Sequence, residues 1–406
     1  MSKYLSLLFF SSVLFISCSS DDDTPPVEDS VEVPLTYSFE RDGVSTVSFS
    51  GQTTRILMAG ELVSAMRNFD TATETSLQNM FAHEEGAQDF SDSDLNTSDK
   101  SLRSKTAASF DYFSANTAES TAIKETFENY LTAQINEVFP NENTLAEPGV
   151  AGQIADGSST RYVNAQGLEY NQAFAKSLIG ALMADQMLNN YLSEEVLNEA
   201  DNVSNNNNDI TEEGKSYTTM EHKWDEAYGY IYGTSVNPAN PNETIGEDDK
   251  FLNEYTGQVN RDSDFNTIAD EIFEAFKLGR AAIVAKNYDV RDAQAAIIRQ
   301  KISEVIAVRG IYYLQQAKNK IVAGNQTSAF HALSEAYGFV YSLRFTRNNT
   351  TGESFFDSVE VNDLINQLLD DNENGFWSLT PETIDSVSES IAAKFDFTVS
   401  QAGSVD

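Results

Sequence analysis

Apolar residues recur at helical spacing along most of this 406-residue chain, and this periodicity restricts the fold more than any other feature of the sequence. Between residues 119 and 139, for example, Ile123, Phe127 and Leu131 share one face, and Pro140 ends the run. Comparable stripes cover residues 55–69, 169–192, 217–232, 266–286, 293–322, 328–343, 359–369 and 381–395. The last of these has Thr380 as its expected N-cap, followed by Pro381 at the first helical position.

The rest of the chain carries little strand signal. Residues 37–53 alternate apolar and polar side chains and predict a short hairpin or an irregular cap, whereas polar residues mark 201–214, 237–249 and 348–354 as loops. Hydrophobic residues make up 40% of the chain, enough for a large core. We therefore expect an all-α fold, a duplicated helical bundle of two bundles packed side by side, with a short irregular or β segment at its N-terminus.

The first 18 residues are typical of an export signal. Lys3 precedes an apolar run that ends at Ile16, too short to span a bilayer, and Cys18 follows as the single cysteine of the chain. This arrangement resembles a bacterial lipobox, in which the cysteine thiol is acylated and becomes the mature N-terminus, although Phe15 replaces the usual leucine. The alternative is an ordinary cleaved signal with an incidental cysteine.

Residues 19–36 are acidic and proline-containing, and we expect a disordered tether there. Directly after Cys18, the run Ser-Ser-Asp-Asp-Asp resembles the export signal that sends lipoproteins of Bacteroidetes-type bacteria to the surface of the outer membrane. A solvated spacer is the alternative interpretation. The prediction is a lipoprotein held to the outer membrane by its lipid anchor, on the cell surface.

Composition excludes several classes of function. With 63 acidic and 26 basic residues the formal charge is −37, so a nucleic-acid partner is not expected. The single cysteine excludes disulfides within the chain and, once acylated, a thiol enzyme. The sequence also lacks a phosphate-binding glycine loop, a Gly-x-Ser-x-Gly elbow and a His-Glu-x-x-His motif, and enzymatic activity is therefore left uncertain and disfavoured.

An eleven-residue segment occurs twice. Residues 222–232 (HKWDEAYGYIY) align without gaps on residues 331–341 (HALSEAYGFVY), with six identities, and each copy follows a long predicted helix. An internal duplication accounts for both facts. It divides the chain into a first helical half, residues 37–250, and a second, residues 251–406.

Each copy places a histidine, a glutamate and a glycine on one helical face. These are His222, Glu226 and Gly229 in the first copy, and His331, Glu335 and Gly338 in the second. A solvated surface pair is the plain interpretation of each His/Glu pair, but an exposed glycine within a helix costs about 1 kcal/mol relative to alanine. The repeated glycine therefore predicts a closely packed neighbour, either a helix or a ligand. Our hypothesis is that both faces meet between the halves in one polar site.

Two groups of side chains are candidate metal ligands. His222, Asp225, Glu226, His331 and Glu335 offer the imidazole and carboxylate donors that suit iron. Asp370, Asn372 and Asn374 match the opening of a calcium loop, but the closing ligand is missing, and the alternative is a glycine-terminated turn. The third histidine, His83, lies in a polar stretch that we expect to be exposed.

Three sequence blocks are similar to an uncharacterised lipoprotein family of Bacteroidetes-type bacteria that neighbours the imelysin-like family, also called the iron-regulated protein A family. The blocks are SFSGQTTR at 48–55, HKWDEAYG at 222–229 and NGFWSLTPE at 374–382. Imelysin-like proteins imply an all-helical two-bundle fold and a Gly-x-His-x-x-Glu motif proposed to bind metal. Here Met220 stands in place of the glycine, Asp225 replaces the glutamate in the first copy, and Ser334 replaces it in the second.

The resemblance implies non-catalytic ligand binding in iron or haem acquisition, beside an outer-membrane transporter and an imelysin-like protein. Two alternatives stay open. In a metallopeptidase, Glu226 would act as a general base beside a metal held by His222. In an interaction scaffold, the repeated His/Glu pairs would tie helices together.

Overall fold

A computed structural model describes residues 31–404 of the chain. The predicted signal peptide, the lipidation site Cys18 and most of the tether lie outside these residues. Across the described range, no helix combines the length and the apolar character needed to cross a membrane.

The described residues are mainly helical, which confirms the all-α fold class. The longer helices are α1 (Ser50–Ala65), α2 (Glu74–Ala82), α6 (Thr117–Ala133), α7 (Tyr170–Leu178), α10 (Thr219–Tyr232), α11 (Leu252–Asn260), α12 (Ile268–Val284), α13 (Tyr288–Val322), α14 (Gln326–Ser342), α15 (Ser358–Leu368) and α16 (Pro381–Ala392).

Shorter elements connect these helices. The short α-helices are α3 (Ser93–Asn96), α4 (Leu102–Lys105), α5 (Phe110–Phe113), α8 (Glu194–Leu197), α9 (Asn202–Asn207) and α17 (Val399–Ala402). π-Helical segments are η1 (Gln134–Val138), η3 (Ile179–Ala184) and η4 (Met187–Tyr191), and 3₁₀ turns are η2 (Phe139–Asn141), η5 (Pro241–Glu243), η6 (Leu343–Phe345) and η7 (Gly375–Ser378).

Two antiparallel hairpins complete the described structure. β1 (Glu40–Arg41) pairs with β2 (Val44–Ser45), which confirms the hairpin expected between residues 37 and 53. β3 (Gly152–Asp156) pairs with β4 (Ser159–Val163), and Gly152 lies opposite Val163. This second hairpin was not predicted, although its two-residue loop Gly157-Ser158, with Gly157 at a φ of +60°, is a known hairpin signal.

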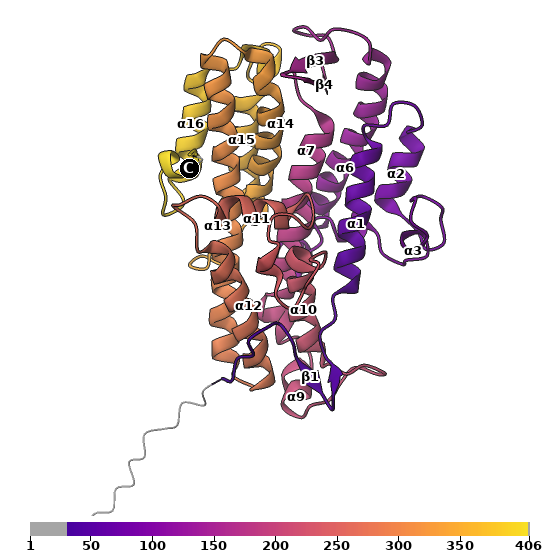
Figure 1. Cartoon of the computed structure of the whole chain (residues 1–406), viewed down its shortest axis with the longest axis vertical. Coiled ribbons are helices and arrows are strands. Elements are labelled where there is room, and N and C mark those ends of the chain that lie inside the picture. The colour runs from indigo at the N-terminus through magenta and orange to yellow at the C-terminus, as the bar shows by residue number, and fades with distance from the viewer. Residues whose placement is uncertain (1–30, 405–406) are drawn as a thin grey trace, which may run out of the picture.

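Two long helical rods set the arrangement (Figure 1). One is α13, whose 35 residues span about 52 Å, with α12 along its first half and α14 and α16 along its second. The other runs from α7 through η3 and η4, and it contacts α14 near its start and α10 near its end. Helices from both predicted halves thus pack together, since α7 precedes residue 250 and α14 follows it. The boundary at 250 stays a prediction.

The predicted helices occur where expected, with ends displaced by a few residues. Thr380 caps α16 by accepting a hydrogen bond from the amide of Thr383, as expected. The segment 201–214 was expected to be a loop, but it contains α9, whose side chains Asn202 and Asn206 are buried. The nine-residue helices α2 and α11 and the short α-helices of four to six residues were not predicted, because so few turns carry little periodicity.

Candidate ligand-binding site

The first copy of the repeat lies on α10, and its histidine and glutamate bind neighbouring protein groups. The Nδ1 atom of His222 lies 3.0 Å from the carbonyl oxygen of Ser48, and its ring stacks on Tyr217 at 4.5 Å between centroids. Glu226 accepts a hydrogen bond of 3.0 Å from the side-chain amide of Gln52. Both side chains therefore fasten α10 to the start of α1.

Asp225 of the same copy is fully buried and takes part in an ion-pair cluster. It accepts hydrogen bonds from the Tyr37 hydroxyl (2.7 Å), the Ser48 amide (3.2 Å) and Nε of Arg280 (3.1 Å). Arg280 is also fully buried and pairs with Glu221 at 3.1 Å. Burial raises the pKa of Asp225 to about 6, and the charge of Arg280 opposes that rise. Both oxygens of Asp225 are occupied, so it holds the N-terminal segment against α10.

The second copy lies on α14 and has a different polar environment. Nδ1 of His331 lies 3.1 Å from a carboxylate oxygen of Glu169, and its Nε2 lies 3.7 Å from Glu335. Glu335 is buried, lies 3.4 Å from Nζ of Lys176, and accepts a 3.4 Å hydrogen bond from the Tyr255 hydroxyl. His331 thus lies between two carboxylates, that of Glu169 at the N-cap of α7 and that of Glu335 on its own helix.

Both copies use the same positions to dock on the start of another helix. In each copy, the side chain three positions after the histidine accepts a hydrogen bond from a backbone amide near the start of that helix. Asp225 accepts from the amide of Ser48, and Ser334 accepts from the amide of Glu169 at 2.9 Å. The repeated glycine permits the close approach. A Cβ atom on Gly229 would lie 2.5 Å from Cβ of Phe49, and one on Gly338 would lie 2.4 Å from Cβ of Lys176. The predicted close packing at the glycines is confirmed, and protein elements supply it.

The contacts of the two copies give no support to the hypothesis of one shared site between them. Gln52, which binds Glu226, also lies 3.5 Å from the hydroxyl of Tyr191 at the end of the α7–η4 rod. His331 instead contacts Glu169, which precedes the same rod. These rod positions are 22 residues apart, or roughly 30 Å, because the π-helical segments η3 and η4 rise less per residue than the roughly 1.5 Å of an α-helix. No small ligand spans that distance, and the two copies meet opposite ends of the rod.

The arrangement of the donors gives no support to either metal assignment. Within residues 31–404, no group of three or more His, Cys, Asp or Glu side chains is placed to hold a metal ion. Asp370 is exposed and accepts a 3.4 Å hydrogen bond from Gln166, and Asn374 adopts a left-handed φ of +66° before η7, as in a turn. The iron and calcium sites stay predictions.

His83 was expected to be exposed, but it is buried. Its Nδ1 lies 2.7 Å from the Asp89 carboxylate, its ring packs edge-on against Phe90, and Nε2 has no partner among the described residues. The polar sequence around His83 misled the prediction because the chain folds back after α2 and covers the imidazole with Phe90.

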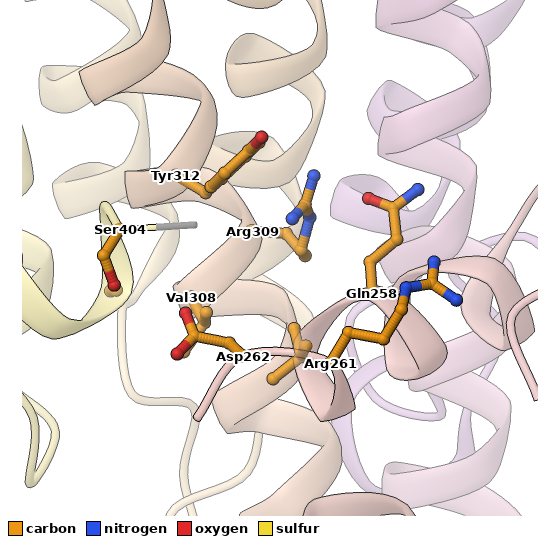
Figure 2. A pocket seen from close by; sticks show the side chains of 9 residues that line it. Gln258, Arg261, Asp262, Val308, Arg309, Tyr312 and Ser404 are labelled. Atoms are coloured by element: carbon orange, nitrogen blue, oxygen red, sulfur yellow. The ribbon is translucent and has the colours of Figure 1, made fainter. Parts of the chain in front are cut away.

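A cavity of about 300 Å³ lies between α11, α13 and the last described residues of the chain. Its lining residues are Gln258, Val259, Arg261, Asp262, Val308, Arg309, Tyr312, Ala402 and Ser404, most of them visible in Figure 2. In that view Arg309, Tyr312 and Gln258 extend to one side, and the Asp262 carboxylate lies toward Ser404. This cavity was not predicted from the sequence.

Arg309 gives the cavity its chemical character. The residue is 5% exposed, its Nε atom is buried without a partner, and its side chain makes no hydrogen bond or ion pair with any residue in 31–404. Its guanidinium carbon lies 4.0 Å from the ring centroid of Tyr312, 4.5 Å from that of Tyr313 and 5.5 Å from that of Tyr255. The faces of these rings attract the positive charge of Arg309. They do not provide hydrogen-bond acceptors for its N–H groups, which point outward in the plane of the guanidinium.

A sequence signal for Arg309 existed. It occupies the apolar stripe of α13 at helical spacing from Ile302 and Ile306, where a basic residue is unexpected. The sequence does not reveal which residues surround Arg309, because these come from α11 and from the end of the chain.

The cavity is joined to the second copy of the repeat through Tyr255. The Tyr255 ring lies 5.0 Å from Nζ of Lys176 and 5.5 Å from the guanidinium carbon of Arg309, and its hydroxyl donates to Glu335. Burial, together with the charge of Glu335, raises the pKa of Tyr255 well above its ordinary value, so the phenol stays a donor. His331 and Glu335 thus belong to a polar network that ends at the cavity.

Residues 34–398 match the family model described as Domain of unknown function (DUF4856), and the chain belongs to that family. No curated protein and no solved structure matches the chain.

Proposed function

We propose that this member of the DUF4856 family is a non-catalytic binding protein whose cavity at Arg309 receives an anionic group of its ligand. The observation that carries the proposal is the side chain of Arg309, which is 5% exposed, has a buried Nε and finds no acceptor for its guanidinium among the described residues. Burying a charge without a partner costs several kcal/mol as a rough figure, and such groups are ordinarily paired. A ligand anion would supply the missing acceptor.

The composition of the chain strengthens this argument. Acidic residues outnumber basic ones by 63 to 26, so a carboxylate partner for a buried arginine is easily provided. Arg280 illustrates the usual outcome, since both Glu221 and Asp225 pair with it. Arg309 instead lines a cavity, with the exposed Arg261 at the same cavity to add positive potential.

We place this binding protein on the outer membrane, anchored through Cys18 and working in iron or haem acquisition beside a transporter and an imelysin-like protein. The anion requirement is compatible with that role, because haem carries propionate groups and many ferric chelates carry carboxylates. The support for iron itself is the resemblance described above. A binding role is favoured over catalysis because His222, Glu226 and His331 are all engaged by neighbouring protein groups.

The test is calorimetric titration of a soluble form, residues 19–406, with haem, ferric citrate, citrate and the simple carboxylate benzoate. We expect at least one of them to bind, and Arg309→Gln to weaken that binding about tenfold or more, because a hydrogen-bonded charge pair contributes about 1.5–3 kcal/mol. The matched control is Arg67→Gln, which removes the same charge from an exposed position. Equal binding by wild type and Arg309→Gln, or no binding at all, would reject the proposal.

A structural role for the repeat is the second candidate, because both copies fasten a helix to the start of another. His222→Ala should then lower the melting temperature and leave ligand binding unchanged. The metallopeptidase alternative requires that the protein hydrolyse peptides in a metal-dependent manner and that Glu226→Gln abolish this activity.

A further inference from the structure

We infer that the cavity at Arg309 selects a small monocarboxylate with an apolar body, in preference to a tetrahedral anion or an anion of higher charge. This inference rests on the proposed function, namely that the cavity binds an anion. It adds the chemical class of the group bound at Arg309, which follows from the shape of the donor, the cavity walls and the position of Asp262.

The donor favours a flat acceptor. A guanidinium presents its N–H groups as a planar fork, and a carboxylate can meet two of them in that plane. The rings of Tyr312, Tyr313 and Tyr255 have their centroids within 5.5 Å of the guanidinium carbon, and the N–H groups of the fork have no acceptor among residues 31–404. A carboxylate can enter edge-on between such rings, whereas a phosphate or sulfate presents bulk in every direction.

The walls favour an apolar body of limited size. Val259, Val308 and Ala402 line the cavity together with the ring of Tyr312. A volume of about 300 Å³ lies at the small end of ligand sites, so a single ring or a short branched chain fills it. Burial of such a body removes apolar surface from water and adds affinity beyond the ion pair.

Asp262 limits the total charge of the ligand. Its side chain is buried at the cavity, and one carboxylate oxygen, Oδ1, accepts a 3.0 Å hydrogen bond from the amide of Asp264. No ion pair connects Asp262 to Arg309 or Arg261 in residues 31–404, and Figure 2 shows its carboxylate on the Ser404 side of the cavity, away from the guanidinium. A second anionic group placed there would meet like charge, whereas a hydroxyl or ammonium group could donate to the carboxylate.

Titration of the soluble form, residues 19–406, with benzoate, benzamide, phthalate and phosphate tests the inference. Benzoate should bind at least tenfold more tightly than the uncharged benzamide, than phosphate and than the dianion phthalate. Arg309→Lys should weaken benzoate binding about tenfold, since lysine keeps the charge but not the planar fork. Asp262→Asn should improve phthalate binding relative to benzoate, and Arg67→Gln should change none of these affinities.

The possible outcomes distinguish the inferred preference for a monocarboxylate from the proposed function, which is anion binding at Arg309. If phosphate binds as tightly as benzoate, or Arg309→Lys retains full affinity, the preference for a planar carboxylate is wrong while anion binding at Arg309 stands. If benzoate fails to bind at millimolar concentration while a larger anion binds and loses affinity in Arg309→Gln, only the ligand class is overturned. If no anion distinguishes wild type from Arg309→Gln, both are rejected.

Discussion

Replacing the repeated glycine of the second copy tests how closely α14 approaches α7. In Gly338→Ala, the new Cβ would lie 2.4 Å from Cβ of Lys176 and 2.9 Å from the backbone nitrogen of Ser177. Neither atom is the end of a flexible side chain, so the helices must separate or shift. Such overpacking costs about 1–3 kcal/mol, and occasionally more.

A gain in helix propensity opposes this cost. Alanine is favoured over glycine by about 1 kcal/mol in a helix interior, so the expected net loss is up to about 2 kcal/mol in the free energy of unfolding. Gly60 in α1 provides the matched control, because a Cβ there meets nothing within 4 Å. Gly60→Ala should therefore stabilise the protein by up to about 1 kcal/mol. The same chemical change is expected to have opposite signs at the two positions.

Urea unfolding followed by circular dichroism measures both variants. We expect the midpoint of Gly338→Ala below that of wild type and the midpoint of Gly60→Ala at or above it. Gly229→Ala, whose Cβ would lie 2.5 Å from Cβ of Phe49, should follow Gly338→Ala. Equal gains in Gly338→Ala and Gly60→Ala would refute the interpretation of the repeat as a close-packing device.

Three further predictions concern buried charges and the anchor. Burial raises the pKa of Asp185 to about 7, so its contribution to stability falls as pH rises from about 4 to 7. The free energy of unfolding of Asp185→Asn should therefore rise relative to that of wild type by up to about 4 kcal/mol as pH increases across that window. Urea unfolding at each pH measures the difference between the two proteins, and a difference that does not change with pH would contradict this prediction. Arg280→Leu leaves the carboxylates of Glu221 and Asp225 buried without their cation and should cost about 3–5 kcal/mol, or prevent folding, whereas an unchanged melting temperature would show the cluster to be unimportant. Cys18→Ser should abolish incorporation of labelled palmitate and release the protein from the membrane fraction; labelling that persists would exclude lipidation at Cys18.

Local sequence signals were sufficient for most helices and for the packing at the repeated glycines. The 3.6-residue periodicity marks a helix wherever it persists for several turns, and Pro140 and Thr380 mark ends that the structure retains. Gly229 and Gly338 were informative because glycine within a helix has a cost that only close packing offsets. Helical periodicity, helix ends and glycines within helices can all be recognised from residues that are only a few positions apart in the chain.

The identity of the contacts could not be read in the same way. Asp225 neutralises Arg280, 55 positions away, and His331 meets Glu169, 162 positions away. His83 was expected to be exposed because its sequence neighbours are polar, yet the returning chain buries it. A pairing between distant residues leaves no periodic trace in a single sequence.

The sequence alone determined that this chain is helical, contains a duplicated His/Glu/Gly face and carries a strong negative charge, because these properties depend on composition and on short-range spacing. Only the tertiary structure decided that the two copies lie at opposite ends of one helical rod, and that Arg309 lines a cavity without a carboxylate partner among residues 31–404. The physical reason is that burial and charge pairing depend on which helices pack together, and that choice is made by the whole fold.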